Sequence, residues 1–162
     1  MSELPEFVLE REFNASVDLV WRAWTEPGLL NRWYGPGVET IIHEFDLKPE
    51  GKWLNEMKMS GGSNFQMIIF KEVNKPQKLV WHHCSTDENW NIAANPMMPD
   101  WPRILLTTVT FMENAGKTNV RLSQIPMDPT KAEIACFAEM KDSMSGGWGM
   151  GYTIIDELLA DL

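Results

Sequence analysis

Apolar and polar residues alternate along much of the chain up to Gln124, a period typical of half-buried β-strands. Short groups of glycine, proline, asparagine and lysine interrupt this alternation where turns are expected. The long stretch Thr86–Pro102 has neither period and is expected to be an irregular loop, which is usually functional or mobile. The alternation predicts seven strands, at Phe7–Phe13, Val38–Asp46, Lys52–Met59, Phe65–Val73, Lys78–Ser85, Ile104–Met112 and Thr118–Gln124.

A helical period of about 3.6 residues replaces the alternation in three segments. Two short helices are expected after the first strand. The first spans Ser16–Thr25, and the second starts at Pro27, carries Leu29, Leu30 and Trp33, and ends at Gly35-Pro36-Gly37. A long helix is expected from Pro129 to Leu162. Its middle, Gly146–Gly151, holds four glycines, each of which costs about 1 kcal/mol relative to alanine inside a helix. We therefore expect a bend or a close approach to another backbone there.

The order of these elements predicts an α+β helix-grip fold. A seven-stranded antiparallel sheet has to curl in order to bury its apolar face, and only the C-terminal helix is long enough to cover that face. The sheet is therefore expected to wrap around this helix, with the two short helices closing one end. No repeat or linker interrupts the pattern, so residues 1–162 are expected to form a single domain.

Composition narrows the choice of partners. The chain has 162 residues and a net charge of −9, which disfavours nucleic acid because phosphate binding needs clustered lysine and arginine. No apolar run approaches the roughly 20 residues that span a bilayer, and the acidic start does not resemble a signal peptide. Two cysteines, Cys84 and Cys136, make no disulfide framework, so reduced thiols and a cytoplasmic location are expected. Eight tryptophans and eleven methionines suit either a pocket or an aromatic core.

Several short motifs, in this order and spacing, resemble a known family. The chain resembles the START-like superfamily, also called SRPBCC, from Phe7 to Leu162. It is most similar to bacterial proteins named for homology to the activator of the heat-shock-protein-90 ATPase. One departure is Glu50-Gly51, where the family often has paired glycines. The motifs are Arg11-Glu12-Phe13, Val20–Thr25, Trp33–Pro36, Asp46–Trp53, Pro76–Trp81, Thr108–Phe111, Gly116–Thr118 and Gly147-Trp148.

The resemblance implies a helix-grip fold with a hydrophobic cavity. Members of this superfamily bind lipids, hormones or polyketides, and a few are cyclases or hydratases. The chaperone-activating role implied by the family name belongs to eukaryotic proteins that carry an additional domain, for which this chain has no room. A chaperone partner therefore stays an alternative to small-molecule binding.

Two adjacent histidines, His82 and His83, are the main candidates for chemistry. Neighbouring residues of a strand point to opposite faces, so both cannot bind one metal ion, and no metal site or cofactor is expected. If His83 faces inward with Trp81, it would orient a ligand or act as a general base together with Asn55 or Arg11. The alternatives are a hydrogen-bonded core or surface histidine, or a sheet whose inward pair is His82 and Cys84.

We expect a module that binds a hydrophobic small molecule between the sheet and the C-terminal helix. A cyclase or hydrolase-like enzyme that uses the same cavity, and a homodimer, remain open alternatives. A cavity below roughly 300 Å³ would undermine the binding hypothesis, because ligand pockets usually exceed that volume. The residues expected to line the cavity, which would serve equally well as solid core, are Trp53, Asn55, Met57, Met67, Trp81, His83, Met140, Met144 and Trp148.

Overall fold

The computed structural model describes residues 4–35 and 37–162. Its elements follow the predicted order of strand, two short helices, six strands and a long helix. The strands are β1 (Phe7–Phe13), β2 (Glu39–Phe45), β3 (Lys52–Met59), β4 (Gly62–Asn74), β5 (Lys78–Thr86), β6 (Ile104–Asn114) and β7 (Lys117–Pro126). The helices are α1 (Val17–Thr25), α2 (Pro27–Trp33) and α3 (Lys131–Asp161).

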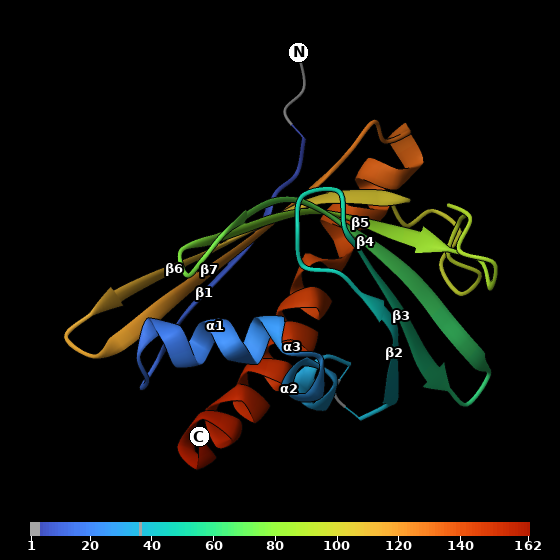
Figure 1. The fold of residues 1–162 in the computed structure, drawn as a ribbon. Helices are drawn as coiled ribbons and strands as arrows, with labels where there is room; N and C mark the ends of the chain where they lie inside the picture. The colour runs from blue at the N-terminus through green and yellow to red at the C-terminus, as the bar shows by residue number, and fades with distance from the viewer. Residues whose placement is uncertain (1–3, 36) are drawn as a thin grey trace.

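The seven strands form one antiparallel sheet in the order β1-β7-β6-β5-β4-β3-β2. Register shifts between Ile42 and Glu44 in β2 and between Phe70 and Glu72 in β4 add bulges, which bend and twist strands. The curved sheet arches over α3, while α1 and α2 lie beside the C-terminal part of α3 (Figure 1). The predicted α+β helix-grip fold is confirmed.

Helices α1 and α3 begin at polar capping residues. The Ser16 hydroxyl accepts from the backbone N–H of Leu19 at the start of α1. At the start of α3, the Thr130 hydroxyl accepts from the Glu133 N–H over 3.1 Å, and the Glu133 carboxylate accepts from the Thr130 N–H over 2.9 Å. This reciprocal capping box satisfies two backbone donors that would otherwise lack partners.

The two halves of α3 are buried to different degrees. Up to Met150, the only buried residue of the helix is Phe137. From Gly151 onward the helix is firmly docked, and its buried residues are Gly151, Tyr152, Ile155, Leu158 and Leu159. The core of the protein therefore lies between the C-terminal part of α3, the two short helices and the middle of the sheet, whereas the first half of α3 covers the sheet more loosely.

Candidate functional site

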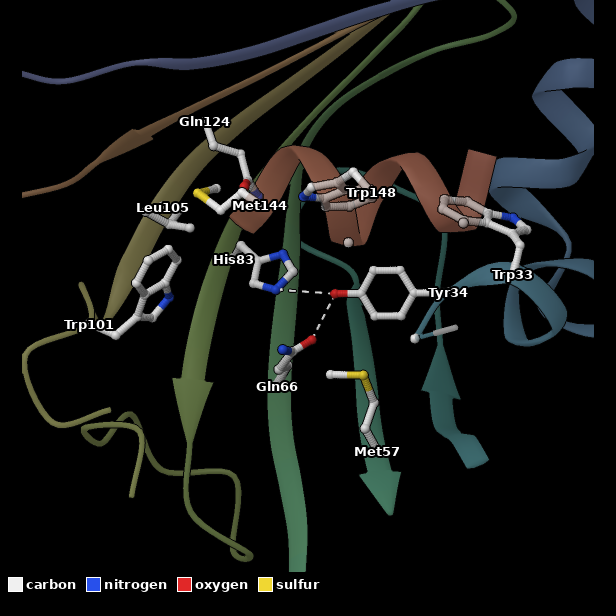
Figure 2. A pocket seen from close by; sticks show the side chains of 13 residues that line it. Trp33, Tyr34, Met57, Gln66, His83, Trp101, Leu105, Gln124, Met144 and Trp148 are labelled. Atoms are coloured by element: carbon white, nitrogen blue, oxygen red, sulfur yellow. Dashed lines mark hydrogen bonds between the residues drawn. The ribbon is translucent and has the colours of Figure 1, made fainter. Parts of the chain in front are cut away.

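A pocket of about 250 Å³ lies between the inner face of the sheet and the middle of α3. Figure 2 shows α3 passing along one side of the lining side chains, with Met144 and Trp148 coming from the helix and Gln66 and His83 from the sheet. Gly147 is exposed and lines the pocket, so the pocket is accessible to solvent on that side. Its lining residues are Trp33, Tyr34, Gly35, Met57, Gln66, His83, Trp101, Leu105, Gln124, Met144, Gly147, Trp148 and Gly151.

Four of the nine predicted site residues lie in this lining: Met57, His83, Met144 and Trp148. Of the two faces of β5 that the sequence left open, the one with Trp81 and His83 is turned toward the pocket. His82 lies on the opposite face, where burial and, to a smaller extent, the nearby Lys71 ammonium lower its pKa.

Trp53, Asn55 and Trp81 share the inward face but lie beneath the pocket. Trp53 and Trp81 are buried, and the Trp53 ring packs against Tyr34 with 5.0 Å between the ring centroids. Asn55 is fully buried and accepts a hydrogen bond from the Trp53 indole. These residues are therefore part of the buried core and do not line the pocket. Met140 of α3 also lies outside the lining.

Met67 differs from the prediction because it lies on the opposite face of β4. A five-residue loop at 60–64 would have paired Met67 with Met57 on the inward face. In the structure β4 begins at Gly62, so the turn consists of Ser60 and Gly61, and Asn55 pairs with Gln66. This change of register moves Met67 outward and Gln66 inward, because successive side chains of a strand alternate between the two faces.

Sequence reasoning missed the residues that come from outside the expected strand positions. Tyr34 and Gly35 follow α2, and Trp101 belongs to the long loop before β6 and packs against Phe137 of α3, with 5.5 Å between the ring centroids. Gln66 and Gln124 occupy inward strand positions, where a polar side chain among apolar neighbours would have been a detectable signal. The length of the turn before β4 concealed this signal for Gln66.

His83 forms the centre of a hydrogen-bond chain in the pocket wall. The Trp81 indole N–H donates to Nδ1 of His83 over 3.3 Å. Nε2 of His83 lies 3.3 Å from the Tyr34 hydroxyl, and this hydroxyl donates to Oε1 of Gln66 over 2.7 Å (Figure 2). Both ring nitrogens of His83 therefore have protein partners.

Burial determines the protonation of this chain. It lowers the pKa of His83 to about 4, because the charged imidazolium would lose its hydration. For the same reason burial raises the pKa of Tyr34 above its ordinary value. Both groups are neutral near pH 7, and His83 is a weak base whose nitrogens are already engaged.

Arg11 does not reach His83. It forms an ion pair with Asp156 near the C-terminal end of α3, and its guanidinium carbon lies 5.6 Å from the centroid of the Phe13 ring. Asn55 is enclosed beside Trp53. The three side chains proposed to act together as an enzyme site therefore do not converge on one cavity. Within residues 4–35 and 37–162, no three histidine, cysteine, aspartate or glutamate side chains are grouped to hold a metal ion.

Aromatic rings enclose the α2 side of the pocket. The Trp148 ring stacks on Trp24 with an interplanar angle of 13° and a centroid distance of 6.1 Å. It meets the Tyr34 ring edge-on at 5.8 Å and lies 6.3 Å from Trp33. These contacts connect α3 to both short helices and fix the Trp148 ring at the pocket wall.

A larger hollow of about 530 Å³ lies elsewhere, beside the turn between β4 and β5 and the start of α1. It includes exposed residues such as Gln77 and Met112, and no hydrogen-bonded group of side chains comparable to that around His83 is found among its described residues. We therefore consider the smaller pocket the better candidate, since it combines aromatic walls with a few oriented polar groups.

A known protein family matches most of this chain. The model of the family described as activator of Hsp90 ATPase homolog 1-like protein matches residues 14–160. The chain belongs to this family. No significant match was found among curated proteins. The family match agrees with the resemblance to bacterial members of the START-like superfamily.

Solved structures show the same fold at low sequence identity. A crystal structure from Mycobacterium smegmatis is 20% identical, with a TM-score of 0.79, and the match covers 98% of this chain and 96% of that one. A solution structure from Arthrobacter aurescens is 21% identical, with a TM-score of 0.80 and coverage of 97% and 87%. A crystal structure from Nitrosomonas europaea is 25% identical, with a TM-score of 0.74 and coverage of 99% and 97%.

Within residues 4–35 and 37–162, no helix is both long enough and apolar enough to cross a bilayer.

Proposed function

We propose that the chain binds a small, predominantly apolar molecule in the pocket between α3 and the sheet. The observation that carries this proposal is the composition of the wall, in which aromatic rings and two methionines surround a few oriented, neutral polar groups. Such a wall is typical of small-molecule sites, where apolar contacts supply affinity and a few polar groups select the orientation. The pocket lies under the less buried part of α3. Displacing the helix there costs less free energy than displacing its docked C-terminal part.

The volume limits the size of the ligand. At about 250 Å³ the pocket falls below the ~300 Å³ at which the usual range of ligand sites begins, which counts against a ligand of ordinary size. It still exceeds the roughly 150 Å³ of an apolar cavity that accommodates benzene. The ligand is therefore a compact molecule of one or two rings rather than a lipid or a large polyketide.

Binding is favoured over catalysis because of the state of His83. With a pKa of about 4 and both nitrogens engaged, this residue is poorly suited to removing a proton near neutral pH. We place the protein in the cytoplasm, a location supported by its two free thiols, Cys84 and Cys136.

Native mass spectrometry of the protein purified from its own host tests this proposal. We expect a fraction of the wild-type protein to carry one small molecule, which collisional activation releases and identifies. Gly147→Leu is the matched variant, because Gly147 lines the pocket and no atom lies within 4 Å of the added Cβ. A retained molecule that is equally abundant in Gly147→Leu would mean that it binds elsewhere.

A further inference from the structure

We infer that the pocket takes an uncharged ligand that presents a hydrogen-bond acceptor, such as a carbonyl oxygen, to the side-chain amide of Gln66. This inference rests on the proposed function and specifies the ligand class. It follows from the direction of the hydrogen-bond chain around His83 and from the charges in the pocket wall.

The direction of the chain is set at Trp81. An indole N–H can only donate, so Nδ1 of His83 must be the unprotonated nitrogen that accepts. The neutral imidazole then carries its proton on Nε2, which donates to the Tyr34 oxygen. The Tyr34 hydroxyl must therefore donate onward to Gln66.

This direction fixes the orientation of the Gln66 amide. The oxygen Oε1 accepts from Tyr34, and the NH₂ group points away from Tyr34 (Figure 2). With the reversed amide, the Tyr34 oxygen would accept from both His83 and Gln66, which would leave the buried Tyr34 O–H without an acceptor in this chain. Gln66 lines the pocket, and its nitrogen is not fully buried and makes no hydrogen bond to another described residue. Its two N–H donors are therefore available to a ligand in the pocket.

The remaining polar groups of the wall also favour an acceptor on the ligand. Nε2 of Gln124 donates to the Thr107 hydroxyl over 3.1 Å, which leaves Oε1 of Gln124 as a free acceptor. The indole N–H groups of Trp101 and Trp148 have no partner among the described residues. Among the amide and indole groups of the wall, free N–H donors therefore outnumber free acceptors, and an acceptor-bearing ligand satisfies more of them.

Charge in the wall favours an uncharged ligand. The described lining residues include no aspartate, glutamate, lysine or arginine, and His83 is neutral. An ionised ligand would thus lose hydration without gaining a counter-charge, which is costly in an apolar site. The net charge of −9 further disfavours an anion, and the donors of Gln66 disfavour a cation.

Four one-ring probes test this inference: acetophenone, its apolar isostere α-methylstyrene, benzoate and phenyltrimethylammonium. Their dissociation constants are measured by two-dimensional NMR titration at pH 8 for the wild type and for Gln66→Met, which keeps the length of the side chain but removes its donor.

We expect the affinity for acetophenone relative to α-methylstyrene to fall about 2- to 10-fold in Gln66→Met, the range expected for one hydrogen bond. We also expect benzoate and phenyltrimethylammonium to bind at least about tenfold more weakly than acetophenone, because neither finds a counter-charge.

A second variant and a control keep the test decisive. Gln66→Glu retains an oxygen that accepts from Tyr34 while removing the N–H donors, so the same loss of preference for acetophenone is expected. Gln77→Met makes the same exchange as Gln66→Met at an exposed turn residue and should change nothing. An unchanged preference in both Gln66 variants, or a charged probe that binds as tightly as acetophenone, would overturn the inference. Failure of all four probes to bind would instead overturn the proposed function.

Discussion

Gly151 of α3 lies directly against Trp33 at the end of α2. A Cβ at Gly151 would lie 3.0 Å from the backbone oxygen of Trp33 and 3.1 Å from its ring carbon Cε3. By contrast, no atom lies within 4 Å of a Cβ built at Gly146, Gly147 or Gly149. The close approach expected from the glycine-rich segment therefore occurs at one position only, and the other glycines leave the helix surface open.

The contact between Gly151 and Trp33 predicts opposite effects for two equivalent substitutions. We expect Gly151→Ala to lower the free energy of unfolding by about 1 kcal/mol or more, because buried Trp33 has little room to move. The control Gly146→Ala should raise it by up to about 1 kcal/mol, because alanine is the better helix former. Urea unfolding followed by circular dichroism measures both values. Stabilisation by both substitutions would show that Trp33 adapts without cost.

The buried, neutral His83 makes stability depend on pH. The pKa of His83 is about 4 in the folded protein and about 6.5 when unfolded, so the unfolded chain binds more protons between these values. This contribution is fully present above about pH 6.5 and is lost as the pH falls toward 4. We expect His83 to account for a loss on the order of 3 kcal/mol across that window.

Comparison with His83→Gln isolates this contribution, because carboxylates and His82 titrate in both proteins. Urea unfolding at several pH values between 4 and 7.5 should give a steeper fall in stability for the wild type than for the variant. Parallel pH profiles would mean that His83 is protonated in the folded state as readily as in the unfolded state.

Tyr34→Phe removes the hydroxyl that connects His83 to Gln66. The variant leaves the Nε2–H of His83 and the oxygen of Gln66 without this partner, so we expect a loss of about 1–2 kcal/mol in unfolding free energy. Tyr152→Phe is the matched control, since the Tyr152 hydroxyl is buried and has no partner among the described residues. Thermal and urea unfolding should show Tyr152→Phe to be neutral or stabilising. Equal losses in the two variants would contradict the role given to the chain around His83.

The ion pair of Arg11 and Asp156 connects β1 to the C-terminal part of α3. Its side chains are 36% and 40% exposed, so water and salt weaken the attraction. A double-mutant cycle with Arg11→Met and Asp156→Asn should therefore give a coupling energy of about 1 kcal/mol or less. A coupling of several kcal/mol would indicate that the pair behaves as a buried one.

The fold was predictable from the sequence because the spacing of apolar residues along the chain identifies its strands and helices. Alternation located the strands, and helical spacing located α3. The spacing of two residues put His83 on the same face as Trp81, but it did not say whether that face points inward. The pocket was less predictable, because alternation gives the face of a residue but not its depth below other side chains. Trp53, Asn55 and Trp81 share the face of His83, yet other side chains cover them.

Two other features of the site depended on information that periodicity does not contain. The face of Met67 depended on the length of one turn, since a two-residue turn and a five-residue loop give opposite registers. Trp101 and Tyr34 come from irregular segments, whose positions follow only from tertiary packing. The orientation of the Gln66 amide depends on the direction of its hydrogen bond with Tyr34. That direction follows only from the partners of Trp81 and Tyr34 in the structure.

The most direct test of the account is a map of NMR chemical-shift changes in isotopically labelled protein titrated with acetophenone. We predict saturable changes at the residues around the pocket, centred on Gln66, His83 and Leu105, with weaker binding in Gly147→Leu. Changes centred instead on the larger hollow near Gln77 and Met112, or changes that are unaffected by Gly147→Leu, would contradict ligand binding in the pocket between α3 and the sheet.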